Sequence, residues 1–113
     1  MKPFRYLEKR PGGVELEWRM VELLNSTALH AEAGAMRHCV YSYTGRCMRR
    51  ISGIWSLRVR TENGEKRVLT VEVNPRTRRI VQVRAAQNRR AGGRSYGILR
   101  KWAQFAGVAL WVR

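Results

Sequence analysis

The middle of the chain alternates apolar and polar residues with a period of two. Residues 54–61 and residues 67–74 both show this alternation, and Glu62-Asn63-Gly64-Glu65 lies between them. Asn-Gly is a preferred pair for a tight hairpin turn, because both central positions of that turn need a positive φ. A third alternating run, residues 79–86, follows the turn-forming residues 75–78. The pattern predicts a three-stranded antiparallel meander whose apolar face is covered by helices.

The alternation also assigns side chains to the two faces of this meander. In the third run it places Val81, Val83 and Ala85 on the apolar face and Ile80 on the other. The polar face is expected to collect the following side chains: Arg58, Arg60, Thr70, Glu72, Gln82 and Arg84.

Helical spacing is found before the meander. Apolar residues within 14–25 recur at intervals of three and four, which predicts a first helix. Ser26 or Thr27 is suited to cap a short second helix over residues 28–33. A third helix is expected over residues 35–50, with Cys39 on its apolar stripe. We therefore expect an α+β fold with N-terminal helices ahead of the meander.

The two ends of the chain are expected to differ. Residues 1–13 contain two prolines and a glycine pair, and are expected to form an extended arm on a single α+β domain spanning residues 14–113. Residues 96–106 have an apolar helical face, and Gly107 is placed to end that helix in a left-handed cap. Residues 108–113 are expected to form a short edge strand.

The charge of the chain indicates a polyanionic partner. The formal net charge is +15, from 23 Lys and Arg against 8 acidic residues; 19 of the basic residues are Arg, and Asp is absent. Residues 1–33 are balanced, so the whole excess lies in residues 34–113. A GC-rich genome accounts for the Arg-to-Lys ratio but not for the net charge. The planar guanidinium suits phosphate, and the excess therefore predicts a nucleic acid, DNA or RNA, as partner.

Several other classes of protein are excluded or disfavoured. No apolar run is long enough to span a membrane, and the first residues lack the apolar stretch of a signal peptide, so a cytoplasmic protein is expected. The absence of Asp disfavours two-metal catalysis, and no glycine-rich nucleotide-binding loop is present. Cys39 and Cys47 lack zinc-motif spacing, and we favour core packing over a metal ligand or a reactive thiol. We expect no metal and no cofactor.

A polar constellation on the sheet is the candidate for catalysis. It consists of His38, Arg58, Glu72 and Gln82, with Arg58 and Gln82 expected as cross-strand neighbours of Glu72. Nearby guanidinium groups stabilise the charged form of a carboxylate, which makes Glu72 a poor general base. We favour a structural role as an ion-pair anchor, with catalysis as the alternative. His38 and Cys39 are adjacent on the expected helix and point about 100° apart, which argues against a Cys–His dyad.

A basic surface is expected beside this constellation. The glycine pair before the last helix permits close approach of an anion. The candidate nucleic-acid-binding residues lie in the strands, the turn after the second strand and the loop after the third: Arg60, Arg76, Arg78, Arg79, Arg84, Arg89, Arg90 and Arg94.

Several motifs occur together in one order. They are Glu32, Met36-Arg37-His38-Cys39-Val40-Tyr41-Ser42-Tyr43, Cys47, Ile54-Trp55-Ser56-Leu57-Arg58, Thr70-Val71-Glu72-Val73, Ile80-Val81-Gln82-Val83-Arg84 and Asn88-Arg89. From about Trp18 to Trp102 the chain resembles the PcfJ-like family, with its helical HCVxxY…C segment, I-x-SLR strand, T-[LV]-E-[IV] strand and Q-x-[KR]-G-x-x-N segment. The resemblance implies an association with conjugative plasmids, integrative elements and phages rather than a particular reaction.

The resemblance also marks individual residues. The polar signature of the family falls on His38, Cys39, Tyr43, Arg58, Glu72, Gln82 and Asn88. The chain departs from the family pattern at Tyr41 and at Ala85, where the family often has Gly, and the larger side chains would narrow a shared pocket.

Three functions are compatible with these observations. The leading hypothesis is a nucleic-acid-binding accessory protein of a mobile genetic element. The second is a metal-independent hydrolase or nuclease that uses the constellation of His38, Arg58, Glu72 and Gln82. The third is a protein-interaction module that meets an acidic protein partner through its basic surface.

Overall fold

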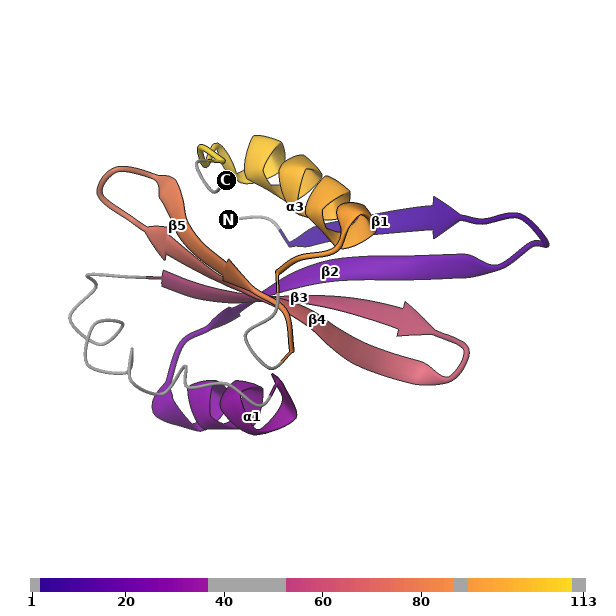
Figure 1. Ribbon diagram of the computed structural model, residues 1–113, viewed down its shortest axis with the longest axis horizontal. Helices are drawn as coiled ribbons and strands as arrows, with labels where there is room; N and C mark the ends of the chain where they lie inside the picture. Colours follow the sequence, from indigo (N-terminus) through magenta and orange to yellow (C-terminus); the bar gives the residue numbers. More distant parts are fainter. Residues whose placement is uncertain (1–2, 37–52, 87–89, 111–113) are drawn as a thin grey trace.

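The computed structural model describes residues 3–36, 53–86 and 90–110 of the 113-residue chain. Its five strands form one antiparallel sheet in chain order: β1 (Phe4–Lys9), β2 (Glu15–Leu23), β3 (Gly53–Thr61), β4 (Gly64–Asn74) and β5 (Arg79–Arg84). Helix α1 (Ser26–Met36) lies in the chain between β2 and β3, and helix α3 (Gly93–Ala106) follows β5. The two helices cover opposite faces of the sheet (Figure 1).

The predicted order of N-terminal helices before a three-stranded meander is wrong, although the α+β class holds. Residues 14–25, expected as a helix, contain strand β2. Leu16, Trp18 and Met20 are buried and alternate with more exposed residues. This period of two is that of a β-strand with one buried face, not that of a helix. Residues 4–9, within the expected extended arm, form β1 and pair with β2.

Helix α1 is longer than the helix predicted over residues 28–33. Its cap is Asn25, whose Oδ1 accepts a hydrogen bond from the backbone N–H of Ala28 at 2.8 Å, rather than Ser26 or Thr27. Most of the helix predicted over residues 35–50 lies outside the described residues.

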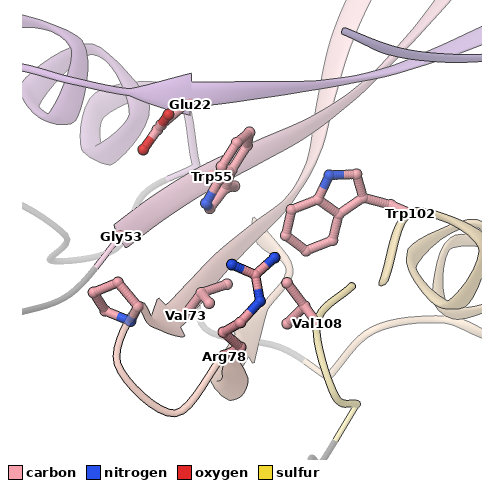
Figure 2. Close-up of a pocket in the computed structure, with 8 residues that line it drawn as sticks. Glu22, Gly53, Trp55, Val73, Arg78, Trp102 and Val108 are labelled. Carbon is pink, nitrogen blue, oxygen red and sulfur yellow. The ribbon is translucent and has the colours of Figure 1, made fainter. Parts of the chain in front are cut away.

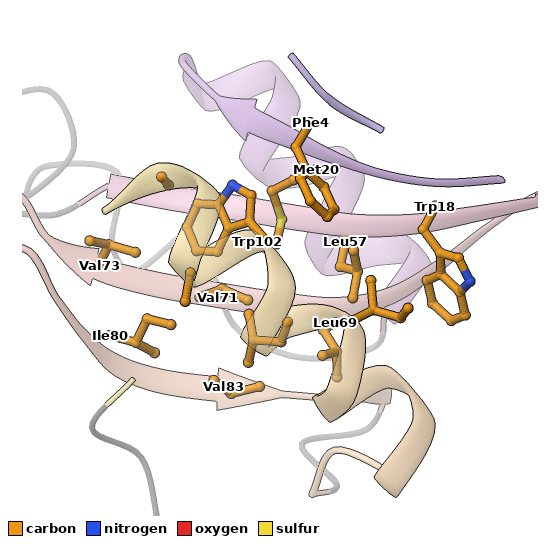
Figure 3. Close-up of a cluster of buried hydrophobic side chains, with 14 of the residues drawn as sticks. Phe4, Trp18, Met20, Leu57, Leu69, Val71, Val73, Ile80, Val83 and Trp102 are labelled. Carbon is orange, nitrogen blue, oxygen red and sulfur yellow. The ribbon is translucent and has the colours of Figure 1, made fainter. Parts of the chain in front are cut away.

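The larger core lies between the sheet and α3. Trp102, Leu57, Leu69 and Ile80 are at most 1% exposed there, and Figure 3 shows Trp102 projecting from α3 over the central strands. Burying such side chains contributes about 1.5–3 kcal/mol each, and this layer therefore supplies most of the hydrophobic stabilisation. A smaller cluster, centred on Leu29, packs under α1 on the other face.

A β-bulge changes the predicted faces of β5. Glu72 pairs with Gln82, but Val73 pairs with Ile80, so Val81 is an extra residue in β5. The bulge turns Ile80 into the core, where it is 0% exposed, and leaves Val81 42% exposed. The predicted assignment of Val81 to the apolar face and Ile80 to the opposite face is therefore wrong.

The C-terminal end of α3 is fixed to the start of β5. Gly107 has φ 69° and caps the helix in the left-handed conformation. Arg78 donates from Nη2 to the carbonyl of Ala106 at 2.7 Å and from Nε to that of Gly107 at 3.2 Å. Ala109 then forms an isolated parallel bridge with Arg79. Within the described ranges, no helix has the length and apolar character needed to cross a membrane.

Two glycines near α3 provide a matched test of the fold. Gly107→Ala forces a side chain into positive φ, with its Cβ only 3.4 Å from Arg78 Nη2, and should lower the free energy of unfolding by about 1 kcal/mol. Gly97→Ala, inside α3 with nothing within 4 Å of the new Cβ, should raise it by roughly 0.5–1 kcal/mol. Urea unfolding followed by circular dichroism measures both. Equal effects of the two changes would contradict the assigned helix end.

Candidate functional site

A fully buried carboxylate connects α1 to the sheet. Glu32 is 0% exposed. Ser56 Oγ donates to its Oε1 at 2.8 Å, and Thr70 Oγ1 donates to its Oε2 at 2.6 Å. Arg67 Nη1 completes the set with an ion pair to Oε1 at 2.8 Å. Both carboxylate oxygens are thus satisfied by β3 and β4, the condition under which a charge tolerates burial.

A second β-bulge directs Arg67 to this carboxylate. Leu57 pairs with Leu69 but Arg58 pairs with Arg67, so Val68 is an extra residue in β4. Val68 packs against the core on the α3 side, and Arg67 consequently lies on the α1 side. Strict alternation from Leu69 would have placed Arg67 on the α3 side. The sequence shows no signal of this bulge, and it therefore does not identify Arg67 as a partner of Glu32.

Arginines lie directly opposite one another on this face. Arg58 pairs across the sheet with Arg19 on β2 and with Arg67 on β4. Like charges in such positions repel. Glu65 reduces the repulsion by accepting a hydrogen bond from Arg19 Nη2 at 2.8 Å, while it lies 3.9 Å from Arg58 Nη1. Arg58 also donates from Nε to Ser56 Oγ at 3.2 Å.

These contacts shift the pKa values of the groups involved. Burial, and next the charge of Arg67, lowers the pKa of Arg58 from its ordinary value. The hydrogen bond from Arg19 lowers the pKa of Glu65. The same bond raises the pKa of Arg19. The hydrogen bond between Arg19 and Glu65 thus favours the charged form of both groups, whereas burial opposes the charge of Arg58.

The structure brings together only part of the predicted constellation. Glu72 and Gln82 are direct cross-strand partners, as predicted, and Glu72 is buried at 7% exposure. Arg58 is not a cross-strand neighbour of Glu72, whose partner on β3 is Ile54. Ile54 and Arg58 are four residues apart on β3, a separation of about 13 Å along the strand. His38 lies outside the described residues, as do the signature residues Cys39, Tyr43 and Asn88.

Four of the predicted nucleic-acid-binding arginines are engaged within the protein. Arg60 lies 3.8 Å from Glu17 and 4.0 Å from Glu65, and Arg94 lies 3.9 Å from Glu8. Arg84 Nη1 donates to the neighbouring backbone carbonyl at 3.1 Å. The fourth, Arg78, caps α3 as described above.

Three other arginines of the set are directed to solvent. Arg76, Arg79 and Arg90 are exposed, and no carboxylate in the described parts of the chain lies within ion-pair distance of them. Arg89 lies outside the described residues. These arginines belong to a region that lacks counter-charges in its own sequence, because residues 73–113 contain ten basic and no acidic side chains.

A cavity of about 200 Å³ lies between the sheet and α3, beside the turn from β4 to β5 (Figure 2). Trp55 and Trp102 form part of its wall, with ring centroids 5.2 Å apart and an interplanar angle of 52°. The full lining is Glu22, Gly53, Trp55, Val73, Pro75, Arg78, Trp102 and Val108. Aromatic walls, one carboxyl group and one guanidinium group suit a small planar ligand with polar edges.

Glu22 reaches this cavity because residues 14–25 include a strand. The register of β2 and β3 places Glu22 directly opposite Trp55. Desolvation raises the pKa of the Glu22 carboxyl group above its ordinary value. The helix predicted over residues 14–25 does not place Glu22 next to Trp55, so the sequence did not identify this pair. In the part of the chain that the structure describes, no group of three or more His, Cys, Asp or Glu is arranged to hold a metal ion.

The Glu32 contacts predict a large loss of stability on their removal. Glu32→Ala leaves Arg67, Ser56 and Thr70 without their buried acceptor and should lower the free energy of unfolding by about 3 kcal/mol. Glu62→Ala, in the exposed turn between β3 and β4, should change it by less than about 0.5 kcal/mol. Urea titration compares the two variants, and a mild effect of Glu32→Ala would show that the carboxylate does not hold α1 in place.

The lowered pKa of Glu65 predicts a pH dependence. A depressed pKa contributes stability that is present above the unfolded pKa, near 4.5, and is lost as the pH falls through the lower folded value. Glu65→Gln should therefore be less stable than the parent chain at pH 7, and the difference should shrink toward pH 3. Thermal melts at several pH values test this. A difference that is constant across the range would contradict it.

The comparisons with known proteins agree with the predicted resemblance. A family model described as PcfJ-like protein matches residues 8–94, more than three quarters of the chain. No curated protein and no solved structure matches the chain. Since the family model covers β2 through the start of α3, the chain belongs to the PcfJ-like protein family.

Proposed function

We propose that this protein is a nucleic-acid-binding accessory protein of a mobile genetic element. The observation that carries the proposal is the acid-free region, residues 73–113, with its ten basic side chains. Exposed arginines without counter-charges bind phosphate through charge and bidentate hydrogen bonds. The mobile-element part of the proposal rests on the association that the resemblance to the PcfJ-like family implies, and the chain's membership of that family supports it.

The arrangement of ion pairs supports this assignment of the surface. The carboxylates in the ion pairs between described residues are Glu8, Glu17, Glu32 and Glu65, all before residue 73. Glu17 and Glu65 offset arginines of β1, β2 and β3. The turn between β4 and β5 keeps Arg76 and Arg79 exposed, and a polyanion meets little repulsion there.

The polar residues on the α1 side are assigned a structural role in this proposal. Ser56, Arg58 and Thr70 belong to the family motifs and are engaged with one another or with Glu32. The separation of Arg58 from Glu72 along the sheet gives no support for a shared reaction centre. These contacts therefore favour a structural role over the hydrolase or nuclease alternative.

Charge removal in the β4–β5 turn tests the proposal. Arg76→Gln with Arg79→Gln should weaken binding to both duplex and single-stranded DNA, and should reduce the slope of log K against log[salt] by about 2, since two phosphate contacts are lost. Fluorescence anisotropy with labelled oligonucleotides between 50 and 200 mM salt gives both quantities.

The matched control removes the same charge elsewhere. Lys9→Gln with Arg10→Gln, at the exposed C-terminal end of β1 and the residue after it, lowers the net charge equally. The affinity should stay within about twofold, since Glu8 precedes Lys9 and Glu15 lies opposite Lys9 on β2. If the two double variants weaken binding equally, the effect is one of net charge and the proposed surface is wrong. Absence of binding to DNA and RNA at low salt would refute the function.

A further inference from the structure

We propose that the cavity lined by Trp55, Trp102, Glu22 and Arg78 binds one unpaired nucleobase of a single-stranded nucleic acid. The inference rests on the proposed function and specifies its ligand. Of the four residues, only Arg78 belongs to the nucleic-acid-binding set predicted from the sequence.

The size and the walls of the cavity suit a single base. A volume of about 200 Å³ is below the roughly 300–1,000 Å³ of pockets for drug-sized ligands, which suits one aromatic ring system. Trp55 lies at the wall with partial exposure, and its ring packs at a tilt against that of Trp102, which also lines the cavity and is 1% exposed. Bases stack on such rings regardless of sequence, since every base has a π-face.

Polar groups on opposite sides of the cavity match the edge of a base. Glu22 lies on the β2 side, whereas the Arg78 guanidinium extends from the β4–β5 turn toward the two indole rings (Figure 2). Two of the five N–H groups of Arg78 bind backbone carbonyls, and among the described residues the other three have no acceptor, so they can donate to an oxygen of the ligand. A carboxylate accepts hydrogen bonds from the exocyclic amino groups of adenine, cytosine and guanine, which thymine lacks.

The cavity is continuous with the proposed phosphate surface. Pro75 and Arg78, which line the cavity, belong to the turn that also carries Arg76, and Arg79 follows directly. A strand whose phosphates contact Arg76 and Arg79 therefore has a base within reach of the indole rings. A duplex keeps its bases stacked and paired, and thus cannot place one there without the cost of extrusion.

The test compares single-stranded and duplex DNA with three variants. Trp55→Leu should weaken binding of a labelled oligo-dC strand about tenfold, with duplex binding within about twofold of the parent chain. Glu22→Gln should reduce the preference for oligo-dC over oligo-dT, because the amide no longer presents two acceptors. Phe105→Leu, an exposed aromatic of α3 that does not line the cavity, is the control and should leave the affinities unchanged.

The outcomes separate this inference from the proposed function. If Trp55→Leu binds oligo-dC as tightly as the parent chain, or if Glu22→Gln keeps the full dC preference, the base site is refuted while phosphate binding stands. If neither single strands nor duplex binds the parent chain, the proposed function fails. If Trp55→Leu is unfolded by circular dichroism, Glu22→Gln decides the inference alone.

Discussion

The buried carboxylate of Glu32 is the interaction on which one whole face of the molecule depends. An isolated charge in a protein interior is unstable, but this one receives hydrogen bonds from Ser56 and Thr70 and an ion pair from Arg67. These donors come from β3 and β4, so the carboxylate fixes the position of α1 on the sheet. The apolar cluster under α1 is small. The hydrogen bonds and the ion pair of Glu32 therefore determine where α1 sits on the sheet more than hydrophobic packing does. Ser56 and Thr70, which belong to the segments that carry the family resemblance, supply the donors that Glu32 needs.

The two faces of the sheet are consequently used in different ways. On the α1 side, arginines from neighbouring strands lie opposite one another and are held by Glu17, Glu32 and Glu65. On the α3 side, a hydrophobic core carries the stability, and the segment that closes it, residues 73–113, has no acidic side chain. Of the four ion-paired carboxylates among the described residues, Glu17, Glu32 and Glu65 thus lie on the α1 side. The exposed Arg76 and Arg79 of the β4–β5 turn support the proposed contact with a polyanion, and the Trp55–Trp102 cavity lies beside the same turn.

Sequence reasoning predicted the local features and missed those set by pairing between strands. The β3–β4 hairpin, α3 and the Gly107 cap were predicted from signals within short segments. The position of the hairpin turn differs from the prediction: Thr61 pairs with Gly64, so Glu62 and Asn63 form the turn, and Gly64 but not Asn63 has a positive φ. Strand β2 was mistaken for a helix because its apolar residues satisfy both periods, and pairing with β1 and β3 decides between them. The bulges at Val68 and Val81 have no local signature, yet they determine which face Arg67 and Ile80 occupy. The Glu32 contacts and the Glu22–Trp55 pair depend on how β2, β3 and β4 are paired, and could not be predicted without that pairing.

In the proposed arrangement, the acid-free segment and the adjoining cavity bind nucleic acid, while the contacts of Glu32 hold α1 on the sheet. Titration of ¹⁵N-labelled protein with a short single-stranded oligonucleotide, followed by ¹H–¹⁵N correlation spectra, distinguishes the two surfaces. We expect the backbone signals of Arg76 to Arg79 and the indole N–H signal of Trp55 to shift, and the backbone signals of Glu32, Ser56 and Thr70 to stay in place. Shifts concentrated on Ser56, Arg58, Arg67 and Thr70, with the β4–β5 turn unaffected, would contradict it.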